Sequence, residues 1–455
     1  MYRVPLFSTY RQRENQVSHA LAVTFERCPT FRKILLERIA EAAGGSKASP
    51  ELRAVCRRHQ GALVATQCHF GHNASLESQE EDTQKSIPDI VFEFPIKEGS
   101  TDADSPCIVV EAKVTAPWEL EQAVRHTSFV KRQLDFVLGL AVTAEDSDEL
   151  LALNKLPQGW ISFPWTKVYT AAVTAGTDQA RELCRVLEIT EAKLMDDKTL
   201  PGTLTAFGGI DFRDESDYSP VRARRMARLL VKELSGLSKL EKSGISVPDP
   251  KSISSSSGKD VWVEANPLPC FEGLPSSVKP PHLNFTVAAG HFGCGLTFPN
   301  ASFRSTLRSG LRKLTDQDSL AAEISRLLRA LESLEALGAE YRPRWYLAQN
   351  YYTSQRARPR QDGMIVFDLR AIIPPNDMNK RDFNIKHNQV WLQSITQLIT
   401  DSHNSAHVQS GIGVDFAYTE ANRAFLTNGK AVAQATAMVW EALLPLAILM
   451  GSPDE

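Results

Sequence analysis

Short runs of β-branched and aromatic residues in the first third of the chain predict the strands of a sheet. Residues 90–94 (IVFEF) form one run, and residues 107–113 (CIVVEAK) form another. Residues 98–105 between them are rich in Gly, Ser and Asp, a composition typical of turns and loops. We therefore predict two neighbouring strands that are joined by a loop.

Helical patterns follow these strands. Residues 119–126 predict a helix that begins shortly after the second strand. Residues 159–169 predict a strand that runs directly into a helix, with a continuation through residues 207–210. This mixture of strands and helices predicts an α/β domain in the N-terminal half of the chain.

The second half of the chain begins with a polar connector and then shows strand and helix patterns again. Residues 236–258 are rich in Ser, Pro and Gly, which suits a flexible linker. A chain of 455 residues also exceeds what one core normally organises. We predict one domain over 1–235, a linker over 236–258 and a second mixed α/β domain over 259–455. The predicted strands of this second domain cover 261–264, 282–287, 345–348 and 364–369, and its predicted helices cover 319–337, 387–400 and 431–450.

Composition narrows the class of protein. With 42% hydrophobic and 23% charged residues the chain can bury a large core, and its net charge of −3 gives no overall basic field. Nucleic-acid contacts would therefore come from local basic patches. The seven cysteines, an odd number, do not suggest a disulfide framework. The first residues lack an apolar signal core and no run approaches the length of a bilayer span, so we expect a cytoplasmic protein without a membrane segment.

Three charged residues stand where these apolar strands begin and end. Asp89 precedes the first strand, and Glu111 and Lys113 close the second. Because side chains alternate along a strand, Glu111 and Lys113 point to one face, where Asp89 can join them. Two close carboxylates repel each other unless a cation lies between them, and oxygen ligands with room for water favour Mg²⁺ or Mn²⁺. The metal would activate a bound water, and Lys113 would hold that water or neutralise charge on a phosphate.

A further acid lies in line with the apolar stripe of a predicted N-terminal helix. Glu14 precedes Val17, Leu21 and Phe25 at helical spacings of i, i+3, i+7 and i+11. A carboxylate on the buried side of a helix needs a compensating partner, and a metal centre is one. Alternatively, Glu14 is an exposed acid of the first turn, where the helix dipole favours negative charge.

These motifs resemble the signature of the PD-(D/E)xK nuclease superfamily, whose members share the restriction-endonuclease-like fold. The Pro-Asp pair at 88–89 and the Glu-Ala-Lys triplet at 111–113 match the two halves of its motif. Residues 14–21 are similar to the E-N-x-x-T/S-x-A-L helix near the N-terminus of many bacterial members. The resemblance covers the N-terminal half only, and it implies a mixed sheet flanked by helices.

The resemblance also implies roles for single residues. Asp89, Glu111 and Glu14 would bind the metal, and Lys113 would act on the attacking water. Superfamily members place a glutamine on the helix that follows this strand, and Gln122 stands there. Ordinary structural interpretations remain open. Glu111 and Lys113 can be an exposed pair at a sheet edge, which contributes little energy, and Gln122 can be a solvated helix residue.

Basic segments are candidates for contacts with phosphate. One lies on the predicted helix 119–126, a second is the basic amphipathic helix predicted over 221–231, and a third is the loop 355–363. Solvated helix faces and a charged hairpin tip explain these residues equally well. The candidate residues are Arg125, Arg222, Arg224, Arg225, Arg356, Arg358 and Arg360.

The motifs and the resemblance together predict a Mg²⁺-dependent endonuclease that hydrolyses phosphodiester bonds, with DNA as the expected substrate. Similar two-domain nucleases act in bacterial restriction and anti-phage defence, and the resemblance implies such a role. A homodimer or a complex with a partner protein is expected, because cutting both strands of a duplex takes two centres. The alternative is a catalytically silent nucleic-acid-binding or scaffold component of a larger complex. The motif itself does not distinguish DNA from RNA.

Overall fold

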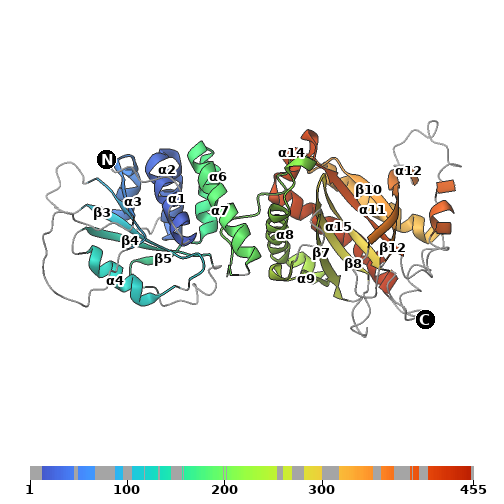
Figure 1. Cartoon of the computed structure of the whole chain (residues 1–455), viewed down its shortest axis with the longest axis horizontal. Coiled ribbons are helices and arrows are strands. Elements are labelled where there is room, and N and C mark those ends of the chain that lie inside the picture. The colour runs from blue at the N-terminus through green and yellow to red at the C-terminus, as the bar shows by residue number, and fades with distance from the viewer. Residues whose placement is uncertain are drawn as a thin grey trace. The chain divides into compact units, whose positions relative to one another are not determined.

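The protein is described here by a computed structural model in which the chain forms two compact units, residues 1–206 and 207–455 (Figure 1). The described residues are 13–45, 50–66, 88–95, 105–116, 118–131, 134–144, 156, 158–197, 199–200, 202–253, 260–268, 281–299, 317–351, 360–372, 390–391, 393–398 and 408–451. The division at 206 lies ahead of the predicted linker 236–258, and the helix that precedes this linker belongs to the second unit. Much of the predicted linker is ordered structure, because it contains α9 (Ser238–Lys242), β6 (Ile245–Ser246) and the short helical turn Pro250–Ser252.

The first unit contains a mixed sheet of five strands in the order β1-β2-β3-β4-β5. The pairs β1–β2 and β2–β3 are antiparallel, whereas β3–β4 and β4–β5 are parallel. The strands are β1 (Leu63–Thr66), β2 (Ile90–Glu93), β3 (Pro106–Ala112), β4 (Asp135–Val142) and β5 (Trp160–Ser162). The predicted strands over 90–94 and 107–113 are confirmed as β2 and β3, and they are neighbours as expected. The predicted strand-to-helix unit over 159–169 is confirmed as β5 followed by α6.

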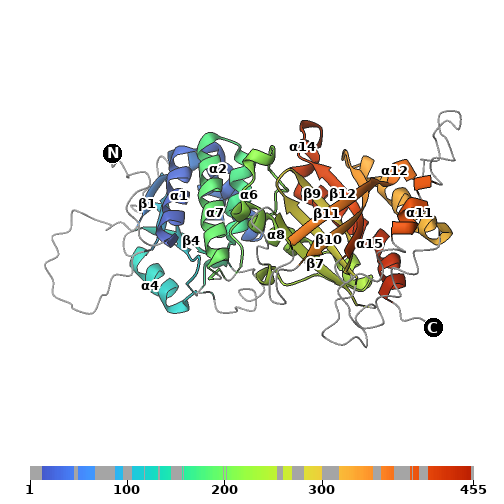
Figure 2. The ribbon, with the colours of Figure 1, turned by 45° about the vertical axis from the view of Figure 1, so that its right-hand side comes forward.

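Helices cover both faces of this sheet. Helix α4 (Leu120–Val130) connects β3 to the parallel strand β4 and confirms the helix predicted over 119–126. The other helices are α1 (Arg13–Arg27), α2 (Pro29–Ala42), α3 (Pro50–Arg57), α6 (Trp165–Ala175) and α7 (Asp178–Asp196). Helices α1, α2, α6 and α7 pack against one another (Figure 2).

Alternation along β3 divides the apolar core of the first unit between the two faces of the sheet. Ile108 and Val110 belong to the larger core, which includes the buried stripe of α1 and residues of α2, α6 and α7. Cys107 and Val109 point to the other face and pack with apolar residues of α4 and with Trp160. The next residue of this second series is Glu111. The strand pattern therefore directs this carboxylate towards α4.

The second unit is built on an antiparallel sheet of seven strands in the order β11-β10-β12-β9-β8-β7-β6. Its longer strands are β7 (Asp260–Pro267), β8 (His282–Ala288), β9 (His291–Pro299), β10 (Arg342–Tyr351), β11 (Arg360–Asp368) and β12 (Val408–Ala417). The strands predicted over 261–264, 282–287, 345–348 and 364–369 are confirmed. Two central strands, β9 and β12, were not predicted. Each carries two glycines that face a neighbouring strand at close range, and glycine is a weak strand signal.

Helices cover the apolar face of this second sheet. They are α8 (Pro220–Ser235), α11 (Gln317–Glu335), α12 (Leu369–Ile372), α14 (Glu420–Leu426) and α15 (Gly429–Gly451). Trp440 of α15 is fully buried, its ring lies 6.3 Å from that of Phe285, and its indole N–H donates to the Asn284 carbonyl at 2.9 Å. These contacts anchor α15 on β8.

The last helix also passes a length and composition test for a membrane span. Residues 429–449 of α15 are long and apolar enough to cross a bilayer, which corrects the expectation that no run approaches that length. Just over half of its most apolar stretch, 56%, is buried inside the second unit. Core helices of folded domains pass the same test, so this feature is weak evidence of membrane contact.

Candidate active site

Strand pairing brings the two predicted metal-binding acids together. Ile90 of β2 pairs with Val110 of β3 in an antiparallel register. Extending this register by one position places Asp89 directly opposite Glu111. The Ala112 backbone N–H donates to Asp89 Oδ2 at 2.8 Å, so the aspartate is tied to the strand that carries the glutamate. The structure thus places both acids on the face of the sheet that α4 covers.

Glu111 is only 1% exposed and is the centre of a charged cluster. Lys113 Nζ lies 2.7 Å from its Oε1, and the Gln122 amide N–H donates to the same oxygen at 2.6 Å. His126 Nε2 lies 2.9 Å from the other carboxylate oxygen, Oε2. The Lys113 side chain is 15% exposed, which leaves it at the rim of the cluster. The interpretation of Glu111 and Lys113 as an exposed edge pair is therefore wrong.

Helix α4 contributes two residues to this cluster. Gln122 and His126 are separated by four positions, so they lie on one face of the helix, one turn apart. Both reach Glu111, and this contact replaces the interpretation of Gln122 as a solvated residue. His126, which is 1% exposed, was not among the predicted site residues. His126 follows Gln122 by four positions, and this spacing could have predicted that both residues reach the same site.

The surroundings of Asp89 disfavour its charged form. Burial, and after it the negative charge of Glu111, raise the pKa of Asp89 to about 7. The Ala112 N–H and the positive charges of Lys113 and His126 act in the opposite direction without cancelling this effect. The pKa of Asp89 is therefore raised chiefly by burial, and the charge of Glu111 adds to this effect.

These two acids fit a hard divalent cation. A cation near both carboxylates would remove the repulsion that raises the pKa of Asp89, and carboxylate oxygens are ligands that Mg²⁺ and Mn²⁺ accept. No cluster of three or more His, Cys, Asp or Glu side chains with metal-binding geometry occurs within the described part of the chain. The third predicted ligand, Glu14, lies in the first turn of α1, and its side chain is outside that part. Helix α1 packs on the face opposite α4, so Glu14 would have to reach the acids around the strand ends.

The arginine predicted on α4 remains available to a ligand. The Arg125 side chain is 54% exposed, and its nearest acid is Glu121 at 3.9 Å on the same helix. An exposed pair at this distance is weak, so it does not prevent a contact with phosphate. Arg125 directly precedes buried His126 on α4, but its own side chain points to solvent.

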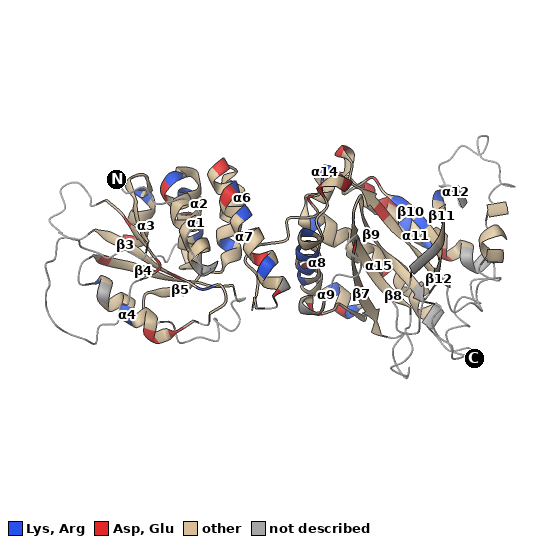
Figure 3. Cartoon of the chain, in the orientation of Figure 1, with Lys and Arg blue, Asp and Glu red and all other residues tan. Residues whose placement is uncertain are grey.

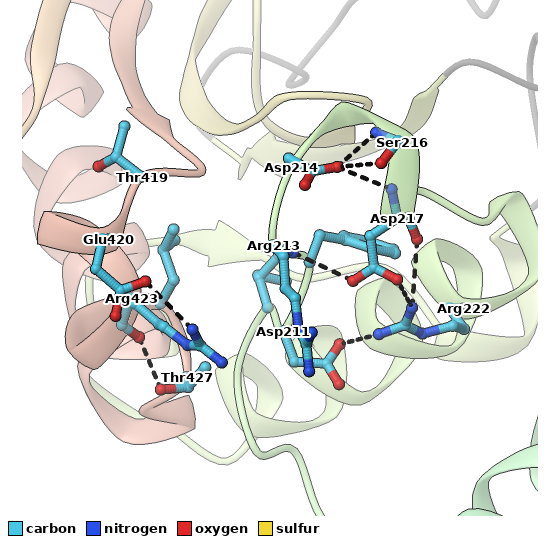
Figure 4. Close-up of a pocket in the computed structure, with 13 residues that line it drawn as sticks. Asp211, Arg213, Asp214, Ser216, Asp217, Arg222, Thr419, Glu420, Arg423 and Thr427 are labelled. Carbon is cyan, nitrogen blue, oxygen red and sulfur yellow. Dashed lines mark hydrogen bonds and ion pairs between the residues drawn. The ribbon is translucent and has the colours of Figure 1, made fainter.

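The arginines of α8 serve the fold of the second unit. Helix α8 carries a dense run of basic residues (Figure 3). Arg225 is 7% exposed and therefore cannot lie along a nucleic-acid backbone as predicted. Arg222 donates to Asp211 and Asp217 at 2.9 Å each and stacks over the Phe212 ring at 4.8 Å (Figure 4).

Of the remaining predicted arginines, the structure describes the side chain of Arg224 alone. Arg224 is half-buried and its Nε donates to the Pro220 carbonyl at 3.3 Å, a local contact within α8. Burial therefore rules out the predicted phosphate contact for Arg225, whereas for Arg222 and Arg224, which have partners within the unit, it stays a prediction. Arg356 and Arg358 lie outside the described residues. Arg360 begins β11, and its side chain also lies outside them.

The second unit also contains two polar cavities. One, of about 650 Å³, lies between residues 210–217 and α14 and is lined by Arg213, Arg222 and Arg423 together with acids (Figure 4). The other, of about 720 Å³, is lined by charged residues at the ends of β9, β10 and β12, including His291 and Asp415. In both cavities acidic and basic side chains are mixed, so neither selects a ligand by charge alone.

Comparisons with models of protein families, with curated proteins and with solved structures find no match for this chain.

Proposed function

We propose that the first unit is a nuclease domain of the PD-(D/E)xK type and that it hydrolyses phosphodiester bonds with Mg²⁺ or Mn²⁺. DNA is the proposed substrate. The supporting observation is the opposed pair of acids: Glu111 is buried on β3, half-buried Asp89 directly precedes the neighbouring strand β2, and Lys113 lies at the rim. The restriction-endonuclease-like fold is part of this proposal and agrees with a mixed sheet covered by helices on both faces.

Stability alone does not explain this pair. A buried carboxylate needs partners, and Glu111 has them in Lys113, Gln122 and His126. A second acid opposite it adds repulsion, as the raised pKa of Asp89 shows. Groups whose pKa is strongly perturbed by burial and by a neighbouring charge concentrate at functional sites. The pair is therefore better explained by a cation-binding role than by a structural one.

Each residue has a defined part in the proposed reaction. Asp89 and Glu111 would hold the cation, which would supply Lewis acidity towards a phosphate oxygen and a bound water. Lys113, on the same side of β3 as Glu111, would position the attacking water or neutralise charge on the phosphate. From α4, Gln122 holds one oxygen of Glu111 by a hydrogen bond, and His126 lies beside the other oxygen. Arg125 and other exposed basic residues would bind the flanking phosphates.

A cleavage assay tests the proposal. Purified protein is incubated with plasmid, linear duplex, single-stranded DNA and RNA in Mg²⁺, Mn²⁺ or EDTA, beside Asp89→Asn and Lys113→Met. The matched controls are Asp178→Asn and Lys193→Met, which change exposed residues of α7 far along the chain from the site. We expect metal-dependent cleavage that the first two variants lose and the controls keep. Equal cleavage by Asp89→Asn and the wild type would reject the proposal.

Isothermal titration with Mn²⁺ separates an inactive enzyme from a protein that only binds nucleic acid. If the wild type cuts nothing but binds Mn²⁺ in a way that Asp89→Asn abolishes, the metal site stands and the substrate or an activator is missing. If it binds nucleic acid without metal, the silent scaffold function is supported instead. A role in restriction or anti-phage defence rests on the resemblance alone, and its test is the survival of phage-infected bacteria that express the wild type or Asp89→Asn.

A further inference from the structure

A buried threonine beside the proposed active site carries a hydroxyl that is not hydrogen-bonded. Thr143 directly follows β4 and is 3% exposed, and its Oγ1 has no hydrogen-bond partner in the part of the chain that the structure describes. A buried hydroxyl without a partner destabilises a fold, whereas a valine of nearly the same shape would not. Stability of the first unit therefore does not explain a threonine at this position.

The pairing of β3 with β4 places this threonine beside Lys113. Glu111 pairs with Ala141 in a parallel register, and the Lys113 backbone N–H donates to the Val142 carbonyl at 2.7 Å. Extending the register by two positions brings Lys113 next to Thr143. Neighbouring strands lie about 5 Å apart, and paired residues point to the same face. The side chains of Lys113 and Thr143 therefore share the face of the sheet that α4 covers.

The backbone of Lys113 is held on both sides, whereas the end of its side chain is not enclosed. Its N–H belongs to the ladder with β4, and its carbonyl accepts from the Trp165 indole N–H at 3.1 Å. The side chain is 15% exposed, and its Nζ lies 2.7 Å from Glu111 Oε1. Because a lysine ammonium sits on a flexible four-carbon stem, it can change partners by rotation about its own bonds. No change in the sheet is needed.

A cation held by Glu111 would compete with Lys113 for the same carboxylate. Oε1 of Glu111 accepts from both Lys113 and Gln122. Two positive groups on one oxygen repel each other, so the ammonium is the group expected to leave, while the uncharged Gln122 amide can stay. An ammonium has three donors and no acceptor, so after leaving Glu111 it needs another oxygen. The Thr143 hydroxyl is an acceptor at the neighbouring position of the sheet.

We propose that Thr143 is a positioning residue for Lys113. Without a cation Lys113 binds Glu111, and when Asp89 and Glu111 hold a cation its ammonium hydrogen-bonds to Thr143 Oγ1 instead. This second position keeps the lysine charge on the α4 face, where it would act on water or phosphate. The proposal rests on the proposed function of the first unit, because it requires the cation.

Ser162 provides a matched control for Thr143. It pairs with Ala141, so it lies on the same face of the sheet, in the row of Glu111 and one strand farther away. Its Oγ is also buried without a hydrogen-bond partner among the described residues. Ser162 therefore shares the unpartnered hydroxyl with Thr143 but does not stand beside Lys113.

Titration calorimetry of the full-length protein with Mn²⁺, without nucleic acid, tests the proposal. Thr143→Val should raise the Kd for Mn²⁺ about 10-fold, because the displaced ammonium loses a charge-assisted hydrogen bond. Thr143→Ser, which keeps a hydroxyl, and Ser162→Ala should both bind Mn²⁺ like the wild type. In EDTA, Thr143→Val should resist urea at least as well as the wild type, because the hydroxyl has no partner to lose. Thr143→Ala repeats the measurement if the valine variant does not fold.

A double-mutant cycle shows whether the effect passes through the lysine. Lys113→Met removes the competing positive charge, so this variant should bind Mn²⁺ more tightly than the wild type. In that background, Thr143→Val should change the Kd by less than about 2-fold, because no ammonium remains to be positioned. Such a loss of effect is the signature of two side chains that act together.

Each outcome decides the proposal. A 10-fold effect of Thr143→Val that serine rescues and that disappears with Lys113→Met supports it. Unchanged Mn²⁺ binding by Thr143→Val overturns it and leaves the proposed nuclease function intact. An equal effect in the Lys113→Met background, or an equal effect of Ser162→Ala, also overturns it, because the hydroxyl would then act by another route. A wild type that binds no Mn²⁺ overturns the cation site and this proposal together.

Discussion

Two buried glutamates of the first unit have contrasting surroundings. Glu191 of α7 is fully buried and accepts hydrogen bonds from the Leu204 and Thr205 backbone N–H groups, at 2.7 and 3.0 Å, and from the Thr205 hydroxyl. These donors are all uncharged and lie in the segment that follows α7. Glu111 is as deeply buried, but its partners include a lysine and a histidine, and a second acid lies opposite it.

The difference separates a structural carboxylate from one that we propose to be functional. The backbone N–H groups of Leu204 and Thr205 and the Thr205 hydroxyl bind Glu191, and these bonds fix the chain after α7. Around Glu111, charges of both signs are gathered and Asp89 adds repulsion that weakens the fold. Equal burial therefore says little about function, whereas the identity and charge of the partners says much more.

The sheet of the second unit contains a network of neutral polar side chains, which differs from the surroundings of both glutamates. Asn284 donates to the Thr297 hydroxyl at 2.8 Å, and that hydroxyl lies 3.1 Å from the Tyr346 hydroxyl. The Trp345 indole N–H donates to Ser410 at 2.6 Å. These groups are neutral and partner one another, so we assign them to the stability and register of the sheet.

The largest expected effect comes from removing one charge of the acidic pair. Asp89→Asn keeps the shape of the side chain and an oxygen that can accept from the Ala112 N–H, but it removes a proposed metal ligand. We expect cleavage to fall by roughly 10³-fold or more, as for loss of a group that stabilises transition-state charge. Single-turnover cleavage of duplex DNA in saturating Mg²⁺ measures this.

The contrasting glutamate should show the opposite behaviour. Glu191→Leu leaves the Leu204 and Thr205 N–H groups without their acceptor, and each unsatisfied buried donor costs roughly 1–3 kcal/mol. We expect the first unit to lose about 3 kcal/mol of unfolding free energy, measured by urea denaturation, while cleavage by the remaining folded protein is unchanged. If the fully folded Glu191→Leu variant lost most of its cleavage activity, Glu191 would not have the purely structural role that we assign to it.

The pH dependence of stability should reveal the raised pKa of Asp89, which burial and the charge of Glu111 produce. The pKa of Asp89 is raised from 3.8 to about 7 in the folded protein, so the folded state holds a proton there that the unfolded chain releases at lower pH. Its contribution to stability is therefore fully present below about pH 4 and is lost as pH rises to about 7. A pKa shift of this size corresponds to a loss of about 4 kcal/mol over this range.

Urea denaturation from pH 4 to pH 8 measures this loss as the difference between the wild type and Asp89→Asn. The variant lacks the titrating group, so it should be the more stable protein at pH 7. Mg²⁺ should reduce the difference by neutralising the pair. Identical pH profiles for the two proteins in EDTA would show that the pKa of Asp89 is not raised in the folded protein.

The smallest effect is expected in the second sheet. Tyr346→Phe removes one hydroxyl from the neutral network and leaves the ring over Gly411 in place. The loss of a hydrogen bond between neutral groups costs about 1 kcal/mol. Thermal denaturation of the second unit should therefore shift by a few degrees, with no change in cleavage. If Tyr346→Phe prevented the second unit from folding, the network would contribute more to stability than its neutral contacts indicate.

The elements that are local in sequence could be predicted from it. The runs at 90–94 and 107–113 became β2 and β3, and alternation along β3 correctly placed Glu111 and Lys113 on one side. Strands β9 and β12 escaped prediction because their glycines lower the strand signal, and their pairing partners lie more than a hundred residues apart. The helix α8 was correctly predicted, but the burial of Arg225 was not, because residue spacing does not show which elements pack on a helix.

The sequence by itself determined the order of strands and helices in much of the chain and the presence of two acids and a lysine at strand ends. Only the tertiary structure decided that Asp89 stands opposite Glu111, that His126 joins the cluster, and that Arg225 is buried. Side-chain periodicity is a local property that residue spacing encodes. Which distant groups share a buried volume depends on the packing of whole elements, and that packing sets the charge balance and the pKa of Asp89 at the proposed site.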